Sequence, residues 1–309
     1  MDELCDKPLP SYVGLMESGA LRRRAEILHE RLRACDLCPR LCGVNRLEGE
    51  LGFCRSGSEA RVSSCNRHTG EEPPISGTGG SGTVFLSNCT MRCIFCQNFP
   101  ISQQGHGKVL SDSELAGRFL MLQKMGVHNL NFVTPTHFSA AIARAICIAA
   151  EKGLRLPIVY NTSGYERVEV IRMLEGIVDI YMPDAKYINP QLAKKYSDAP
   201  DYVEHNLPAL QEMQRQVGDL KFDEQGMARR GLLIRHLVLP GAPDDSIAIL
   251  KMIRDQVSPH AFVSLMSQYF PAHRAHEVEP MDRRLQPEEY EKVLAWMEDS
   301  SLDGFVQNI

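Results

Sequence analysis

From residue 82 onward the chain alternates short apolar or β-branched runs with longer helical patterns, and this alternation constrains the fold more than any other feature. The short runs occupy residues 82–88, 129–135, 157–163, 177–183, 232–240 and 261–269. The helical patterns occupy residues 112–126, 138–153, 166–175, 190–216, 245–257 and 287–299. Strand, helix and strand repeated in this order predict parallel βαβ units, in a barrel or a doubly wound sheet. Six units, short of the eight in a closed barrel, favour an α/β fold with an open or partial barrel.

The segment between the fourth and fifth predicted strands, residues 183–232, is too long for a single helix. It contains the run LKFDEQGMARRG, which predicts a small hairpin before the fifth strand.

Cysteine usage divides the chain. Nine of the ten cysteines precede residue 100, and only Cys147 follows. A stretch rich in Gly, Pro and Ser, residues 66–82, predicts a loop between a Cys-rich module and the main domain. We therefore expect a Cys-rich N-terminal module with its linker at residues 1–75, the partial barrel at 76–285, and a C-terminal helix and tail at 286–309.

Composition and charge exclude some classes of protein. The chain has 34 basic and 39 acidic residues, a formal net charge of -5, so no broad basic surface supports nucleic-acid binding. The N-terminus lacks a signal-peptide core, and the longest low-polarity stretch, residues 140–150, is too short to span a membrane. We expect a cytoplasmic protein without a membrane partner. In that reducing compartment, clustered cysteines indicate metal binding or thiol chemistry rather than disulfides.

Polar side chains follow five of the six predicted strands. The chain places Cys89 after the first strand, Thr134 and Thr136 after the second, Asn161 and Ser163 after the third, Asp184 and Lys186 after the fourth, and Gln268 and Tyr269 after the sixth. Single residues of these types are often only caps or turn residues. Because the carboxyl ends of parallel strands share one edge, five such strands together predict a functional site there.

The stretch SNCTMRCIFCQN carries Cys89, Cys93 and Cys96 at C-x3-C-x2-C spacing, directly after a predicted strand. Thiolates on such a loop suit zinc or an iron-sulfur cluster. Structural zinc needs a fourth ligand, and none stands at zinc-finger spacing, although His106 or a distant cysteine could serve. Three thiolates on a four-iron cluster would leave one iron open to a substrate or cofactor.

A second group, Cys35, Cys38, Cys42 and Cys54, has C-x2-C-x3-C-x11-C spacing. Four thiolates would saturate either a structural zinc ion or an electron-relay cluster, and free buried thiols are the alternative. Cys65 could join either group, whereas Cys5 and Cys147 have the character of ordinary thiols.

The motif CTMRCIFCQN, with Phe95 just before the third cysteine, resembles the C-x3-C-x-aromatic-C signature of the radical S-adenosylmethionine (SAM) enzymes. The stretches EEPPISGTGGSGTVFLSNC, YNTSGYE, DIYMPDAKY, IRHLVLPG and LMSQYFPAH resemble the branch similar to pyruvate formate-lyase activating enzyme. This resemblance covers residues 30 to about 300.

The resemblance implies a partial (β/α)6 barrel with a [4Fe-4S] cluster on Cys89, Cys93 and Cys96. The amino and carboxylate groups of SAM would chelate the open fourth iron. The reduced cluster would cleave SAM to methionine and a 5′-deoxyadenosyl radical that abstracts hydrogen from a substrate. Reduced flavodoxin or ferredoxin is the electron donor that this family implies.

The resemblance also implies which residues bind the cofactor. Where many relatives read Gly-Gly-Glu-Pro, residues 133–137 read VTPTH, so backbone carbonyls or the hydroxyls of Thr134 and Thr136 would meet the SAM amino group. Asn161 and Ser163 could bond the methionine carboxylate or the ribose. The remaining expected cofactor-binding residues are Phe95, Asp184, Lys186 and His273.

Asp184 and Lys186 resemble the Asp-x-Lys of activating enzymes. An Asp carboxylate can accept from ribose hydroxyls, and a Lys ammonium can pair with a carboxylate. Alternatively the two side chains merely pair with each other at a strand end. His273 would lie at the mouth of the site.

The sequence leaves three functions open. The favoured one is hydrogen abstraction from a protein or peptide, as glycyl-radical activators perform. The second is radical modification of a small metabolite or an RNA base. The third, from another class, is a non-catalytic iron-sulfur or zinc protein, whose fully ligated site would be indifferent to SAM.

Overall fold

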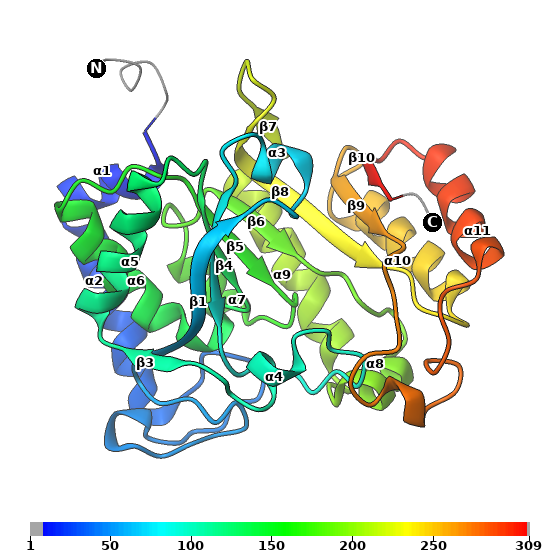
Figure 1. Cartoon of the computed structure of the whole chain (residues 1–309), viewed down its shortest axis with the longest axis horizontal. Helices are drawn as coiled ribbons and strands as arrows, with labels where there is room; N and C mark the ends of the chain where they lie inside the picture. Colours follow the sequence, from blue (N-terminus) through cyan, green and yellow to red (C-terminus); the bar gives the residue numbers. More distant parts are fainter. Residues whose placement is uncertain (1–8, 308–309) are drawn as a thin grey trace.

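The computed structural model describes residues 9–307, and their strands form one mixed sheet (Figure 1). The strand order is β10-β9-β8-β6-β5-β4-β2-β1-β3, with β7 paired to β8. The strands are β1 (Ala60–His68), β2 (Ser81–Leu86), β3 (Lys108–Leu110), β4 (Leu130–Val133), β5 (Ile158–Thr162), β6 (Ile180–Pro183), β7 (Lys221–Phe222), β8 (Ala228–Leu237), β9 (Phe262–Met266) and β10 (Asp303–Val306).

The six predicted strands are β2, β4, β5, β6, β8 and β9, and they pair in parallel in chain order. Strand β10 adds a parallel strand beyond β9, whereas β1 pairs antiparallel with both β2 and β3. Within residues 9–307, the edge strands β3 and β10 do not pair with each other. The prediction of an open α/β barrel is therefore confirmed.

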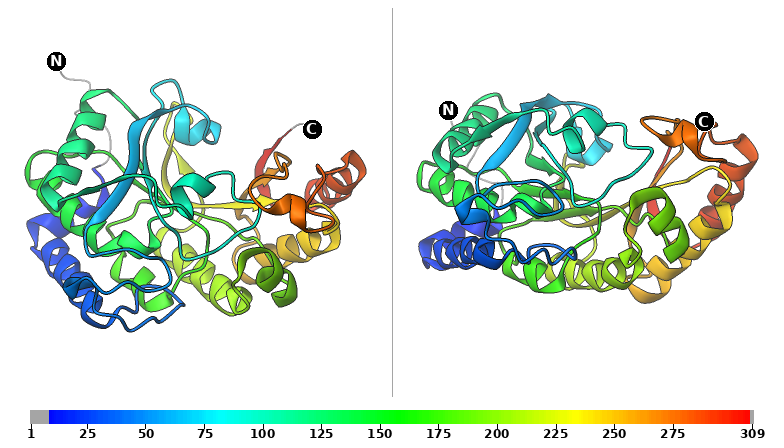
Figure 2. Two further views of the ribbon diagram at one scale, coloured as in Figure 1. Left: turned by 60° about the horizontal axis from the view of Figure 1, so that its bottom comes forward. Right: turned by 90° about the horizontal axis from the view of Figure 1, so that it is seen from below.

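The longer helices cover the outer side of the sheet (Figures 1 and 2). They are α1 (Ser11–Glu17), α2 (Ala20–Glu30), α5 (Asp112–Lys124), α6 (Ser139–Glu151), α7 (Val168–Met173), α8 (Pro190–Ser197), α9 (Tyr202–Val217), α10 (Pro243–Gln256) and α11 (Pro287–Glu298). Two single-turn helices, α3 (Pro73–Ser76) and α4 (Phe99–Ser102), lie in connections. Helix α5 begins with a capping box in which Ser111 and Glu114 satisfy each other's backbone donors.

Helix α6 is apolar on most of its surface because it is covered on two sides. Its segment SAAIARAICIAAE packs against the sheet core and against α2 and α5. Small alanines allow this close helix packing. Helix α2, from the Cys-rich end of the chain, is thus part of the outer layer of the barrel.

The segment 190–216, expected as one helical pattern, forms two helices. Helix α8 ends at Ser197, after which Asp198 adopts a left-handed conformation with φ 50°. Pro200 follows and disfavours helical continuation at the residue before it. The predicted hairpin is confirmed, since β7 pairs antiparallel with β8 across a turn in which Asp223 accepts from the backbone of Gln225 and Met227.

The expected linker, residues 66–82, is only partly a loop. Strand β1 runs to His68, and residues 73–76 form helix α3, so that part of the prediction was wrong. Because β1 pairs with β2, the sheet crosses the boundary expected near residue 75. The division into three parts stays a prediction.

The main apolar core lies between the sheet and its helices. A second apolar cluster surrounds the loop after β2 and contains Met91, Ile94, Phe95, Tyr165, Tyr187, Tyr202, Tyr269 and Met281. No helix within residues 9–307 is both long and apolar enough to cross a membrane. Cys5 lies outside the described residues, and the nine described cysteines form no disulfides.

Candidate functional site at the carboxyl edge of the sheet

The three-cysteine loop leaves the carboxyl end of β2 through a sharp turn. Asn88 adopts a left-handed conformation with φ 70°, and its amide donates to the Ser56 hydroxyl at 3.0 Å. Backbone bonds from Arg92 to Ser197 and from Ile94 to Tyr196, at 3.0 and 2.9 Å, attach the loop to the end of α8. The loop is therefore held from both sides.

Each of the three sulfur atoms has a polar neighbour. The contacts are Cys89 Sγ with the Met91 N–H at 3.4 Å, Cys93 Sγ with the Ser197 hydroxyl at 3.0 Å, and Cys96 Sγ with the Ser102 hydroxyl at 3.1 Å. Burial raises the pKa of Cys89 to about 12, and burial also raises the pKa of Cys93. At neutral pH these sulfurs would become thiolates by binding a metal cation.

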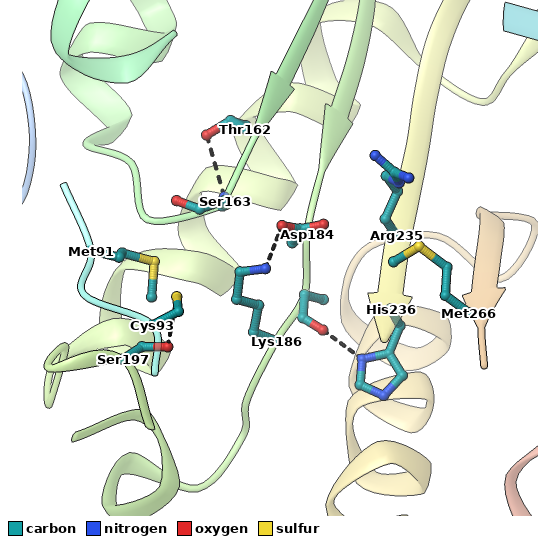
Figure 3. A network of polar contacts seen from close by, with 12 residues as sticks. Met91, Cys93, Thr162, Ser163, Asp184, Lys186, Ser197, Arg235, His236 and Met266 are labelled. Atoms are coloured by element: carbon teal, nitrogen blue, oxygen red, sulfur yellow. Dashed lines mark hydrogen bonds and ion pairs between the residues drawn. The ribbon is translucent and has the colours of Figure 1, made fainter. Parts of the chain in front are cut away.

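Asp184 and Lys186 follow β6 and lie beside Cys93 (Figure 3). Lys186 Nζ donates to Asp184 Oδ2 at 2.5 Å. Burial acts to lower the pKa of Lys186, but the Asp184 carboxylate, together with Cys93 and Cys96 when these are ionised, outweighs it and raises the pKa. The ammonium therefore stays protonated next to the cysteines.

Tyr202 connects the ends of β5 and β6. Its hydroxyl lies 2.8 Å from the Ser163 carbonyl, 2.9 Å from the Asp184 carbonyl and 3.1 Å from the Lys186 N–H. The Ser163 hydroxyl is buried without a hydrogen-bond partner. The structure thus brings Ser163, Asp184 and Lys186 together with Cys93, and it leaves one buried hydroxyl unused.

The second predicted strand end is divided between two environments. Thr134 has a left-handed φ of 59° and donates its backbone N–H to the buried Asn161 carbonyl at 2.8 Å. Thr136 is fully buried, and its hydroxyl donates to Glu166 at 2.5 Å. The Thr136 hydroxyl is therefore occupied within the barrel.

Phe95 and His273 lie against the cysteine loop. Phe95 is buried, with its ring centroid 6.0 Å from that of Tyr269. His273 stacks on Phe99 at 4.7 Å, and the Arg274 N–H donates to the Ile94 carbonyl at 2.8 Å. Burial lowers the pKa of His273. The segment after β9 therefore packs onto the loop, and the His273 ring already has an aromatic partner.

The four N-terminal cysteines also come together. A small pocket is lined by Cys35, Cys38, Cys42 and Cys54, together with Leu37, Val44, Arg46, Gly52 and His137. Among the described residues, no three His, Cys, Asp or Glu side chains converge as a single metal ion would require. This holds for both cysteine groups.

Several residues at this edge were not identified from the sequence. Ser197 contacts Cys93 from 104 positions away, and Glu166 accepts from Thr136 inside the barrel. Arg235 of β8 pairs with the buried Glu72, with Nε 3.0 Å from Oε1. No local motif marks such residues, because each acts through a partner distant in the chain. For Arg235 alone the sequence carried a signal, because a charged residue inside an apolar strand needs a partner within the protein.

The residues present on the loop after β2 fit a polynuclear iron-sulfur cluster. Three thiols on one loop carry sulfur-directed hydrogen bonds, as cluster ligands commonly do. The same loop contributes only three thiols, which leaves one coordination position of a four-iron cluster open.

Comparison with known proteins identifies the class of protein. The model of the Radical SAM superfamily matches residues 83–253, more than half of the chain. The uncharacterized protein MJ0674 of Methanocaldococcus jannaschii is 31% identical over 299 residues, which cover 93% of this chain and 81% of that protein. The chain belongs to the radical SAM superfamily. It is therefore a radical SAM enzyme, and the family implies a [4Fe-4S] cluster and SAM as its cofactors.

Solved structures with similarity to this chain include SuiB and HydG. Streptococcus suis SuiB bound to S-adenosylmethionine is 11% identical with a TM-score of 0.47, over 72% of this chain and 48% of SuiB. HydG, a maturase of the [FeFe]-hydrogenase, is 12% identical with a TM-score of 0.48, over 94% of this chain and 64% of HydG. The chain thus spans about half the length of SuiB and less than two thirds of HydG.

Proposed function

We propose that this enzyme abstracts a hydrogen atom from a protein or peptide, in the manner of an activase for a glycyl-radical enzyme. The use of SAM in this proposal rests on one observation. The Asp184 and Lys186 pair lies beside Cys93, at the edge where the cysteine loop leaves β2. The activase part is supported by five sequence stretches that resemble the activating-enzyme branch.

Cys89, Cys93 and Cys96 are the proposed cluster ligands. With SAM bound, the reduced cluster that these residues would hold would supply one electron for cleavage of the sulfonium C–S bond to methionine and a 5′-deoxyadenosyl radical. The protein holds the cluster loop rigid through α8 and surrounds it with tyrosine, phenylalanine and methionine side chains. This largely apolar surrounding limits the access of water.

Lys186 and Asp184 are the proposed contacts to SAM. A protonated lysine can bind the methionine carboxylate, and Asp184 can accept from ribose hydroxyls. Ser163 offers a buried hydroxyl without a partner, which supports a hydrogen bond to the same cofactor. Asn161 and the backbone of Thr134 extend this edge, and Phe95 and His273 would border the mouth.

Thr136 has a less direct part in the proposal. Because its hydroxyl donates to Glu166, it would act on the cofactor by fixing the turn after β4. The amino group of SAM would then meet backbone carbonyls near Thr134. Thr136 is therefore proposed to position the turn and not to contact SAM itself.

The open sheet supports a large substrate. Strands β3 and β10 are separate edges within residues 9–307, so the barrel is not closed around the site. A polypeptide segment could approach an open barrel from the side. A cytoplasmic flavodoxin or ferredoxin in its reduced form is the proposed electron donor.

The test mixes anaerobically reduced enzyme and SAM with each glycyl-radical enzyme encoded in the same genome. We expect a SAM-dependent organic radical signal in the electron paramagnetic resonance (EPR) spectrum of one partner. The Cys93→Ala variant serves as the control and should give no signal. The absence of a radical on every such partner, with an enzyme that cleaves SAM, would reject the activase function and leave the family assignment intact.

A further inference from the structure

The chain folds tightly around the four N-terminal cysteines. Cys35 exchanges backbone hydrogen bonds with the segment that returns beside it, through Cys35 N–H to Val44 O at 2.9 Å and Gly43 N–H to Cys35 O at 3.0 Å. A Cβ atom at Gly52 would lie 2.8 Å from the Cys42 sulfur. Glycine is therefore required at Gly52 for the chain to approach Cys42, and the four thiols face one small pocket.

Arg46 places a buried positive charge in this pocket. The side chain is 2% exposed, and its Nη1 lies 3.6 Å from Cys35 Sγ. Its other nitrogens donate to the Gly57 carbonyl, and no carboxylate among residues 9–307 pairs with it. A buried guanidinium is stable only near compensating negative charge. A metal centre with four thiolate ligands has a net negative charge and would supply it.

Four thiols can bind either zinc or an iron-sulfur cluster, since each takes four thiolate ligands. The neighbouring loop of Cys89, Cys93 and Cys96 favours the cluster, because the family of this chain binds a [4Fe-4S] cluster there and a second cluster beside it could relay electrons to it.

The two cysteine groups are neighbours in space. The Phe53 N–H donates to Cys42 Sγ at 3.3 Å, and the Phe53 carbonyl accepts from Arg92 at 2.6 Å. Arg92 also donates to the Cys89 carbonyl at 3.1 Å. Phe53 and the Arg92 side chain therefore connect the Cys42 thiol with the backbone of Cys89 in the other cysteine group.

We propose that Cys35, Cys38, Cys42 and Cys54 bind a second iron-sulfur cluster, packed against the loop of the SAM-binding cluster. Four cysteines complete its coordination, so that it has no open iron, in contrast with the first cluster. Arg46 offsets its charge, and Arg92 lies between the two clusters.

The decisive variant lacks the first site: Cys89→Ala, Cys93→Ala and Cys96→Ala combined. After anaerobic reconstitution we expect it to retain roughly two to four iron atoms per chain with matching sulfide. The wild type should hold about four iron atoms more than this variant, roughly six to eight per chain. A folded variant without iron, or one that binds zinc instead, would overturn the proposal. If that variant does not fold, the wild-type content decides, since four iron atoms or fewer would contradict two clusters.

A second variant and a matched control complete the experiment. Combined Cys35→Ala and Cys38→Ala should lose the second cluster and keep the first, whereas Cys147→Ala should keep both. In the fully reduced wild type, magnetic coupling should broaden the EPR signal of each cluster, and each single-cluster variant should show a sharp signal. An unbroadened wild-type spectrum that is the sum of the two variants would contradict the adjacency. Iron content and EPR need no substrate, so the result is independent of the proposed activase function.

Discussion

Lys186 Nζ lies 2.5 Å from Asp184 Oδ2, and the pair stands beside Cys93 at the end of β6 (Figure 3). The backbone fixes this relationship. Asp184 donates its N–H to the Thr162 carbonyl at 2.9 Å, and Ala185 donates to the Arg235 carbonyl at 2.8 Å. The pair is therefore held between β5 and β8 before any cofactor binds.

Replacing Lys186 by methionine should weaken SAM binding. The variant keeps the length of the side chain and removes its charge. A hydrogen bond to a charged group contributes about 1.5 to 3 kcal/mol, so we expect SAM affinity to fall roughly ten- to hundredfold. Calorimetric titration of SAM into the reconstituted enzyme would measure this. Lys194→Met, on the exposed side of α8, should bind as the wild type does; equal affinity in both variants would mean that Lys186 only pairs with Asp184.

Removing the Ser197 hydroxyl should lower the reduction potential of the first cluster. This hydroxyl lies 3.0 Å from Cys93 Sγ, and hydrogen bonds to ligand sulfur favour the reduced, more negative cluster. An EPR-monitored redox titration of Ser197→Ala would show the shift. The exposed Ser301, which contacts the Pro259 carbonyl, provides the matched control as Ser301→Ala. If Ser197→Ala has the same reduction potential as the wild type, the Ser197 hydroxyl does not influence a cluster bound by Cys93.

Glu166 should make the stability of the protein depend on pH. Burial raises the pKa of Glu166 from 4.5 to about 7, although hydrogen bonds from Thr136 and Thr162 oppose the shift. A raised carboxyl pKa stabilises the fold below about pH 4.5, and this contribution is lost as pH rises through about 7. Between about pH 5 and pH 8, the free energy of unfolding should fall by up to roughly 3 kcal/mol relative to Glu166→Gln. Parallel denaturation profiles of the two proteins over this range would refute the shift.

Gly52 should tolerate no side chain, whereas Gly57 should. A Cβ at Gly52 would meet the Cys42 sulfur at 2.8 Å, and nothing lies within 4 Å of one at Gly57. We expect Gly52→Ala to destabilise the protein by about 1 to 3 kcal/mol and to reduce its iron content. Gly57→Ala should change neither, although both glycines lie in the same segment. Chemical denaturation and iron analysis of the pair would decide; equal behaviour of the two variants would contradict the tight packing around Cys42.

The parallel strands were predictable because both of their faces are buried. Strands such as β4 and β6 form apolar runs that contrast with their flanking helices. Strand β1 was missed because its segment ARVSSCNRH is polar and half exposed near the edge of the sheet. Strand β10 was missed because it has only four residues, and three of them, Asp303, Gly304 and Val306, are exposed, so the segment has no strand pattern of its own.

The site was predictable where one short segment carries several of its groups. The cysteine loop and the Asp184 to Lys186 segment are of this kind. Glu166 and Ser197 could not be identified, because their roles arise only where distant segments meet. Thr136 shows the converse, since its position at a strand end predicted cofactor contact while its rotamer directs the hydroxyl to Glu166.

The most direct test of the radical SAM assignment is the formation of 5′-deoxyadenosine by the reconstituted, dithionite-reduced enzyme with SAM under anaerobic conditions. Wild type and Cys147→Ala should both form 5′-deoxyadenosine and methionine in equal amounts. Cys93→Ala should form neither, because it lacks one of the three proposed cluster ligands. Product from Cys93→Ala at the wild-type rate, or none from a wild type with an intact reduced cluster, would contradict the assignment of this site.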